Sequence, residues 1–162
     1  MEETKTCNTT NSQIQSLQRQ HLETEEVLHR LWSTIEQSTD IVMILDRSGV
    51  MEYVNPAFKA LTGYSSEESV GQTLGILKSE HQAGELYEEM WNTVLSGNVF
   101  RGIVTNRKKN GETFIIEKAL TPLRDAGGQI THFIATGRDI TERRKLESDL
   151  QQAPRRWMRL AA

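Results

Sequence analysis

Side chains able to act as nucleophiles, proton carriers or metal ligands are few in this chain, and their spacing does not favour catalysis. The single cysteine, Cys7, lies in a polar N-terminal segment, and the chain contains neither a GxSxG elbow nor a glycine-rich phosphate loop. The adjacent acids Glu67-Glu68 and Glu88-Glu89 fall in predicted helices, where neighbouring side chains point in different directions. No cysteine–histidine cluster has the spacing of a zinc site. The residues therefore predict a protein that is not an enzyme.

Composition narrows the class of protein further. With 162 residues, 36% hydrophobic residues, 25% charged residues and a net charge of -3, the chain suits one domain with extensions and lacks the basic surface of a nucleic-acid binder. No apolar run is long enough for a membrane span, and the polar N-terminus is unlike a signal peptide. A lone cysteine fits a reducing compartment, so we expect a cytoplasmic protein with no nucleic-acid or membrane partner.

The N-terminal region divides into two parts. Residues 1–13 are rich in Thr, Asn, Ser and Glu, so we predict a disordered tail. Residues 14–36 are expected to form an amphipathic, coiled-coil-like helix, because its seam positions recur at alternating intervals of three and four: Ile14, Leu17, His21, Thr24, Leu28, Leu31 and Ile35. A lone helix of this kind is marginal in water, so it either pairs with a second copy of the chain or packs on its own domain.

Residues 37–141 predict an α+β domain. Turn signals separate five β-rich segments at 41–45, 51–54, 100–107, 112–123 and 130–138. Between the second and third of these segments, helix signals occur at 55–63, 65–69 and 85–97, with a looser pattern at 71–82. The pattern predicts a five-stranded antiparallel sheet with helices on one face, flanked by N- and C-terminal helices. An outgoing linker helix is expected at 142–152, and residues 153–162 are expected to be unstructured or an appended tail, because Pro154 interrupts the helix.

Four stretches of this region, in this order and spacing, resemble the PAS sensor domains. The resemblance covers residues 31–141 and is carried by "YVNPAFKALTGYS", "LYEEMWNTVLSGNVFRG", "NRKKNGETF" and "TPLRDAGGQITHFIATGRDITERRKLE". It implies a five-stranded antiparallel sheet that cups a cavity closed by helices. It also implies one of two roles: sensing a small ligand or cofactor, or acting as a ligand-free dimerisation and relay module. In either role the output domain, expected to be a histidine kinase, is absent from this chain.

The resemblance also indicates which residues could hold a cofactor in the cup. In flavin-binding light sensors of this fold, an asparagine five residues before the hairpin glycine binds the isoalloxazine ring, and Asn106 stands five before Gly111. The other matching positions hold Leu74, Ile116 and Gly137 in place of the reactive cysteine, the second asparagine and the glutamine. Cysteinyl–flavin photochemistry is therefore excluded, because Leu74 has no thiol.

The family's FAD-binding redox sensors, such as the nitrogen-fixation and aerotaxis regulators, provide a second comparison. Trp91 matches their helix aromatic, and Phe100 replaces a tryptophan, which keeps a stacking face but loses the indole N–H. With Asn106 and Phe114, these residues are the candidate cofactor-binding positions, and FAD is the candidate cofactor. Haem is disfavoured because residues 85–95 contain no histidine. The alternative is a cup without cofactor, filled by apolar side chains: Leu74, Ile76, Ile116 and Leu120.

The signal relay is expected at Asp139-Ile140-Thr141, where the resemblance joins the last strand to the outgoing helix. Either Asp139 or Thr141 can cap that helix by accepting hydrogen bonds from its first N–H groups. Three arginines are near enough in sequence to pair with the Asp139 carboxylate: Arg138, Arg143 and Arg144. We further expect a homodimer formed through the N-terminal helix and a face of the sheet.

Overall fold

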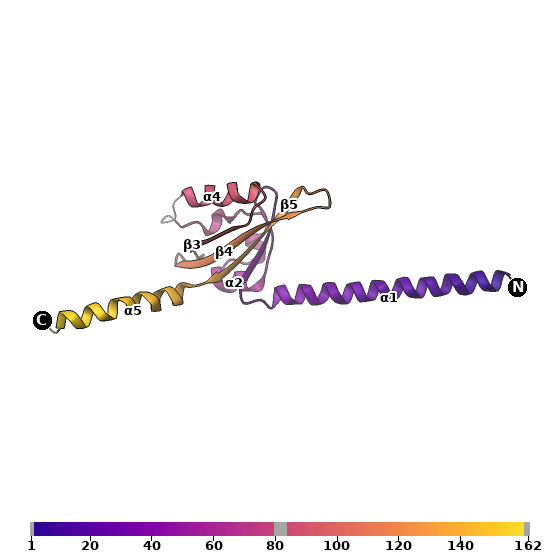
Figure 1. Ribbon diagram of the computed structural model, residues 1–162, viewed down its shortest axis with the longest axis horizontal. Coiled ribbons are helices and arrows are strands. Elements are labelled where there is room, and N and C mark those ends of the chain that lie inside the picture. Colours follow the sequence, from indigo (N-terminus) through magenta and orange to yellow (C-terminus); the bar gives the residue numbers. More distant parts are fainter. Residues whose placement is uncertain (1, 80–83, 161–162) are drawn as a thin grey trace. The chain divides into compact units, whose positions relative to one another are not determined.

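A computed structural model of the protein describes residues 2–79 and 84–160, with side chains described for residues 13–79 and 84–152 (Figure 1). The chain separates into two units, residues 1–37 and residues 38–162. Among the helices of the described ranges, none combines the length and the apolar character needed to cross a bilayer.

The first unit is one long helix, α1 (Glu2–Glu36). An ion pair between Arg19 and Glu23, at 3.2 Å, supports the helix from one turn to the next. The apolar side chains of the predicted seam are exposed on it: Ile14, Leu17, Leu28 and Leu31. The structure differs from the expected disorder of residues 1–13, because the helix begins at residue 2. A polar composition limits what a segment can bury, but an existing helix gains one hydrogen bond for each residue added to its end.

The second unit begins with a hairpin of two strands, β1 (Ile41–Asp46) and β2 (Met51–Val54). Asn55 then starts helix α2 (Pro56–Thr62), as its position before a proline predicts. Its Oδ1 accepts a hydrogen bond from the first turn of α2 at 3.2 Å and another from the Val42 N–H of β1 at 3.0 Å. One buried amide therefore caps the helix and fixes the helix against the first strand.

The chain between α2 and the three long strands consists of short elements. Helix α3 (Ser66–Ser69) begins with the predicted capping box, because Ser65 accepts from the Glu68 N–H and the Glu68 carboxylate accepts from the Ser65 N–H. A single 3-10 turn, η1 (Leu74–Leu77), occupies the stretch expected to be loop or irregular helix. Helix α4 (Gly84–Leu95) follows, and its apolar stripe faces the sheet.

Three long strands complete the sheet: β3 (Phe100–Arg107), β4 (Thr113–Arg124) and β5 (Ile130–Asp139). All pairings are antiparallel, and the strand order is β2-β1-β5-β4-β3. The last strand therefore lies beside the first, with Ile41 opposite Gly137. This order confirms the predicted five-stranded antiparallel sheet, and each strand begins and ends within one residue of its expected bounds.

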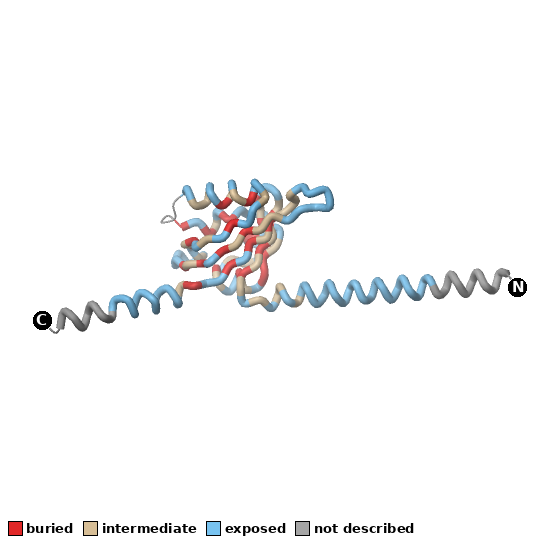
Figure 2. Tube along the Cα trace, viewed as in Figure 1, coloured by how far each residue is buried: buried red, intermediate tan, exposed pale blue. Residues whose placement is uncertain are grey.

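The core lies between the sheet and the helices, which cover one of its faces. Helix α2 packs on β1, α3 on β2, and α4 on both β3 and β4. Burial alternates along the strands, as Figure 2 shows by the red and pale segments of the sheet. The largest fully buried side chains come from both layers: Phe58, Phe114, Phe133, Ile41, Met43, Leu45, Met51, Leu77, Met90, Ile116, Leu120 and Val94. This alternation determines which strand residues face the cup.

Helix α5 (Thr141–Leu160) follows β5 after one residue. Its first half carries exposed leucines, Leu146 and Leu150. The prediction that the helix stops before Pro154 is wrong, because the backbone stays helical to residue 160. A proline inside a helix removes one backbone hydrogen bond and bends the axis, and the helix can continue beyond it.

Candidate functional site

The helix-covered face of the sheet forms the inner wall of the cup, and its side chains come from alternate strand residues. The longest stretch of this wall comes from two neighbouring strands: Phe100, Gly102, Val104 and Asn106 of β3, and Phe114, Ile116, Lys118 and Leu120 of β4. The wall is apolar apart from Asn106 and Lys118, whose exposed fractions are 2% and 4%. These buried polar groups set the chemistry that the wall can offer to a ligand.

Asn106, the predicted flavin-type donor, lies inside the cup near the end of β3. Its Oδ1 accepts a hydrogen bond from the Tyr87 hydroxyl of α4 at 3.3 Å, and its backbone pairs with Lys78 after the 3-10 turn. Burial raises the pKa of Tyr87, so this phenol stays a donor at neutral pH. Phe114 is the strand partner of Asn106 across β3 and β4 and is 1% exposed. The structure thus brings these two candidate residues together.

The two remaining aromatic candidates lie elsewhere in the cup. Trp91 of α4 makes an edge-to-face contact with Phe133 of β5, with ring centroids 5.6 Å apart and an interplanar angle of 80°. Trp91 also covers Gly49, where a Cβ would lie 2.7 Å from the indole ring. Phe100 is buried at the opposite end of β3 from Asn106, with its ring folded over Gly102. Trp91 and Phe100 therefore have partners different from those of Asn106, and their cofactor role stays a prediction.

Two positions that differ from the flavin photosensors are coupled in space. A Cβ added at Gly137 would lie 2.3 Å from Ile116 Cδ1 and 3.2 Å from Ile41 Cγ1. The side chain of Ile116 thus occupies the place from which a glutamine at position 137 would extend. Leu74 is buried as well, at 3% exposure. Asn106 is retained, but the other two donor positions of flavin photosensors hold Ile116 and Gly137, and this arrangement does not fit a flavin held in their manner.

Lys118 is a site residue that sequence reasoning missed. Its side chain is 4% exposed at the centre of β4, and burial lowers the pKa of its ammonium to about 8. Its register partners on both neighbouring strands are glycines, Gly102 on β3 and Gly137 on β5. The signal was available in the sequence, because Phe114, Lys118 and the apolar residues between and after them alternate at the spacing of one strand face.

The predicted relay residues form a compact junction between β5 and α5. The Asp139 carboxylate accepts hydrogen bonds from the Thr141 N–H at 2.8 Å and from the Thr141 hydroxyl at 2.5 Å. The same hydroxyl accepts from the Ile115 N–H of β4 at 2.9 Å. Ile140, which is 8% exposed, donates its N–H to the Ile115 carbonyl at 2.9 Å. Ile140, which joins β5 to α5, and Thr141, the first residue of α5, are therefore both bonded to the backbone of one residue in β4.

Two arginines near this junction, Arg138 and Arg143, pair with residues other than Asp139. Arg138 donates to both carboxylate oxygens of Asp40, at 3.0 and 2.8 Å, and this hydrogen-bonded pair raises the pKa of Arg138. Arg143 pairs with Glu147 one turn further along α5, at 2.9 Å. The prediction that Arg138 or Arg143 would pair with Asp139 is therefore wrong. Strand register explains the first pairing, because β1 and β5 are neighbours.

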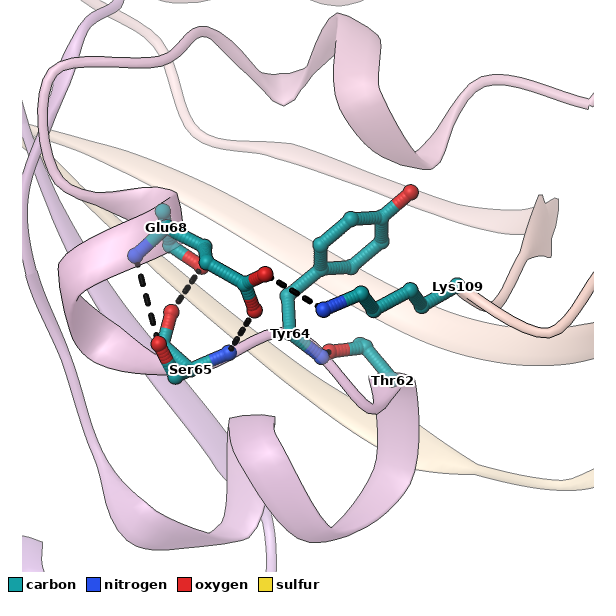
Figure 3. Close-up of polar contacts among 6 residues, drawn as sticks. Thr62, Tyr64, Ser65, Glu68 and Lys109 are labelled. Atoms are coloured by element: carbon teal, nitrogen blue, oxygen red, sulfur yellow. Dashed lines mark hydrogen bonds and ion pairs between the residues drawn. The ribbon is translucent and has the colours of Figure 1, made fainter.

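The hairpin between β3 and β4 is fixed against α2 and α3 (Figure 3). The Lys109 N–H donates to the Thr62 carbonyl at 2.9 Å, and the Lys109 ammonium donates to the Glu68 carboxylate. That hydrogen bond holds the pKa of Glu68 below its ordinary value. The ammonium also lies 5.9 Å from the centroid of the Tyr64 ring. Since Glu68 is the acid of the capping box, one carboxylate joins the hairpin to the start of α3.

The side chains that could bind a metal ion are scattered in the part of the chain that the structure describes. No group of His, Cys, Asp and Glu side chains in that part is arranged to hold a metal ion. His132, a strand histidine, alternates with the buried Phe133 and so lies on the outer face of the sheet. There its Nε2 lies 3.3 Å from a carboxylate oxygen of Glu52.

An antiparallel sheet of this order, with helices over one face and a last strand that leads into a helix, defines a class of small cupped α+β domains. The chain belongs to the PAS fold family, whose family model matches residues 29–140. This match confirms the resemblance drawn from the sequence motifs, and it covers the sheet together with the helices that close the cup.

Individual relatives occur in regulators and sensors. The chain is 31% identical over 120 residues to the nitrogen fixation regulatory protein of Klebsiella oxytoca, covering 74% of this chain and 24% of that protein. It is 27% identical over 89 residues to the blue-light-activated histidine kinase of Brucella canis, covering 55% of this chain and 18% of the kinase. The chain thus spans about a quarter of the first relative's length. These matches support a role in signal sensing.

Solved structures share the fold. An RNA-binding light-oxygen-voltage receptor aligns with a TM-score of 0.73 at 24% identity, covering 86% of this chain and 40% of that chain. The PAS domain of a protein from Colwellia psychrerythraea aligns with a TM-score of 0.67 at 22% identity, covering 72% of this chain and 98% of that chain. The second match covers almost the whole of an isolated PAS domain.

Proposed function

We propose that this chain is a non-catalytic sensory module that transmits the state of its cup through Asp139-Ile140-Thr141 to α5. The output is a histidine kinase domain outside this chain. The observation that carries the proposal is the double role of the Thr141 hydroxyl, which accepts from the Ile115 N–H of β4 and donates to Asp139. One side chain thus links a central strand of the sheet to the first turn of the outgoing helix.

The cup and this junction share the same short stretch of β4. Ile115 lies between Phe114 and Ile116, which are both buried in the inner wall. A ligand or cofactor that displaces either side chain moves the backbone of residue 115, and with it the N–H and carbonyl that hold Ile140 and Thr141. Because a packed core has discrete arrangements, such a displacement favours one of two helix orientations over the other.

Removing the carboxylate of Asp139 tests this relay. In a fusion of the chain to a histidine kinase, we expect Asp139→Ala to leave the domain folded and to uncouple kinase activity from the signal. Asp125→Ala is the matched control, because Asp125 likewise accepts two local hydrogen bonds on its Oδ1, here from two backbone N–H groups at 2.9 Å each, in the turn at the far end of β4 and β5. Kinase regulation that survives Asp139→Ala, with circular dichroism showing the native fold, would rule out the relay.

We also propose that the chain is a homodimer, formed through α1 and the outer face of the sheet. This is favoured by the exposed leucines along α1 and by exposed apolar side chains on the sheet, Ile103 and Leu123. Replacing Leu17 and Leu28 together by glutamate is expected to shift the mass measured by light scattering from dimer to monomer. If dimerisation is all that the domain contributes, a change confined to the cup will not alter the output.

The cofactor alternative is tested by a visible absorption spectrum of protein purified without added cofactor. An FAD-binding redox sensor would show the absorption bands of a flavin in the near-ultraviolet and blue regions. Absence of these bands would favour a colourless ligand or the ligand-free module. Extraction of small molecules from the same preparation, followed by mass spectrometry, distinguishes between those two.

A further inference from the structure

Lys118 occupies an unusual place for a lysine, the middle of the inner wall of the cup. The residues before and after it on the same face of β4, Ile116 and Leu120, are both 0% exposed. Its neighbours across the sheet are Gly102 and Gly137, which have no side chains to cover it. The lysine stem therefore lies between two glycines, with hydrocarbon above and below it along the strand.

The ammonium of Lys118 has no partner among the described residues. Burial is the sole cause of its lowered pKa, and no carboxylate or hydrogen-bond acceptor of the described chain compensates it. Other lysines behave differently: Lys108 pairs with Glu112 at 3.2 Å, and Lys109 pairs with Glu68. In the described side chains every fully covered polar atom has a hydrogen-bond partner. Lys118 Nζ has none, so this atom is not fully covered, although the side chain as a whole is buried.

A purely structural role does not explain a lysine at this position. A lysine that only packs its stem extends the ammonium to bulk water, whereas this whole side chain is 4% exposed. An unpaired buried charge destabilises the fold, and a methionine would fill the same volume without that cost. Buried charges in proteins are normally paired or bound to a ligand. The missing partner of Lys118 is therefore to be sought in a ligand of the cup.

The wall around Lys118 limits the chemistry of that ligand. One ammonium balances one negative charge, and a second charge on a phosphate would meet no further cation on the inner wall of β3 and β4. The other polar side chain of this wall, Asn106, has its Oδ1 occupied by Tyr87, so it can offer amide N–H donors. All remaining wall positions are apolar. These features fit a monocarboxylate with an apolar body.

We propose that the cup binds a small organic monocarboxylic acid whose carboxylate pairs with Lys118. The inference rests on the proposed sensing function and adds the chemical class of the ligand. The acid enters as its anion, and its apolar body replaces water against the side chains of Ile116 and Leu120. Because the partner charge is supplied by the ligand, the apo domain holds an uncompensated ammonium that binding relieves.

The test uses a panel of acids and their neutral counterparts. Alkanoates from butanoate to decanoate, phenylacetate and indole-3-acetate are titrated at pH 7 into the full chain by calorimetry, beside the corresponding primary amides. We expect at least one acid to bind about 10-fold more tightly than its amide. Lys118→Met should weaken that acid by roughly 30-fold, since it removes one member of a buried charge pair. Lys59→Met, on the exposed side of α2, is the matched control and should bind normally.

The thermal melting of the unliganded proteins provides a second readout. Lys118→Met is expected to melt at a higher temperature than the wild type and to lose the further rise that the acid produces. A merely structural lysine would give a lower melting temperature in the variant. Lys118→Gln serves as a second variant that keeps a polar group without the charge.

Three results would overturn the proposal: no acid of the panel binds the wild type, acids and amides bind alike, or Lys118→Met binds the acid as the wild type does. None of these three binding results depends on the relay. The relay is tested separately, because the Asp139→Ala fusion experiment measures how kinase activity responds to the sensor's own signal. Acid binding without any effect of Asp139→Ala would reject the relay alone. A loss of regulation in Asp139→Ala, with no acid bound, would reject the ligand class alone.

Discussion

The buried ammonium of Lys118 makes the stability of this domain depend on pH in a way that one substitution removes. The pKa of Lys118 is about 8 in the folded chain, against an ordinary value of 10.5. Between these values the unfolded chain keeps a proton that the folded chain has lost. The free energy of unfolding therefore rises with pH across that window, and below pH 8 the full penalty of the charged, buried ammonium is present.

The size of the effect follows from the same two values. A difference of about 2.5 in pKa corresponds to about 3 kcal/mol between folded and unfolded chains. The side chain is almost fully buried, so solvent screens its charge only weakly. Lys118→Met keeps the volume of the stem and removes the charge. We expect it to be more stable than the wild type by about 3 kcal/mol at pH 7, with little difference left at pH 10.5.

Urea denaturation followed by tryptophan fluorescence, at half-unit steps from pH 7 to pH 10.5, measures this difference. Other groups titrate in both proteins, so the relevant quantity is the free energy of unfolding of the variant minus that of the wild type at each pH. Tyr87, which faces the sheet from α4, has a raised pKa and is present in both proteins, as are the glutamates of the same helix, Glu85, Glu88 and Glu89. Glu117 and Arg138 alternate to the outer face of the sheet and are also unchanged. A constant difference from pH 7 to 10.5 would contradict the predicted penalty, because it would mean that Lys118 titrates normally in the folded chain.

Three further substitutions test the packing and the junction. Gly137→Ala places a Cβ against Ile116 Cδ1 and should destabilise the fold by about 1–3 kcal/mol in urea, while adding Ile116→Val, which removes Cδ1, should recover most of that loss. Thr141→Val removes the acceptor of the Ile115 N–H, so hydrogen exchange at that amide should accelerate about 10-fold, and unchanged exchange would contradict the observed bond. Asn55→Ala removes a buried helix cap that also binds β1, and it should cost about 2 kcal/mol by thermal melting.

Local signals in the sequence were sufficient to predict the strands of the sheet and the residues at which the helices start. Asn55 before a proline, and Ser65 three residues before Glu68, act within one turn of chain, so their hydrogen bonds can be predicted without tertiary information. Glycine at a turn can also be predicted without tertiary information, because a positive φ, such as the +91° of Gly111, is a requirement of the local backbone. Strand bounds followed from these turns and from alternation.

Contacts between distant segments could not be predicted in this way. Arg138 and Asp40 are 98 residues apart, and they pair because β1 and β5 happen to be neighbours in the sheet. Lys118 was missed because lysine is usually exposed, and only its place between buried residues of one strand face shows otherwise. The first case depends on strand order, which patterns within single segments do not contain, whereas the burial of Lys118 follows from the alternation along β4 alone.

The register of β4 and β5 places the candidate ligand site and the relay two residue pairs apart, on the same face of the sheet. Lys118 is opposite Gly137, and Ile116 is opposite Asp139. The side chain of Ile116 fills the space above Gly137, so any movement of the lysine stem or of its ligand presses on the residue whose strand partner is the helix-capping carboxylate. A signal would have to travel only two residue pairs along two bonded strands. This short path makes Ile116 a positioning residue between site and relay, and Ile116→Ala should weaken the coupling in the kinase fusion even at acid concentrations that saturate the variant.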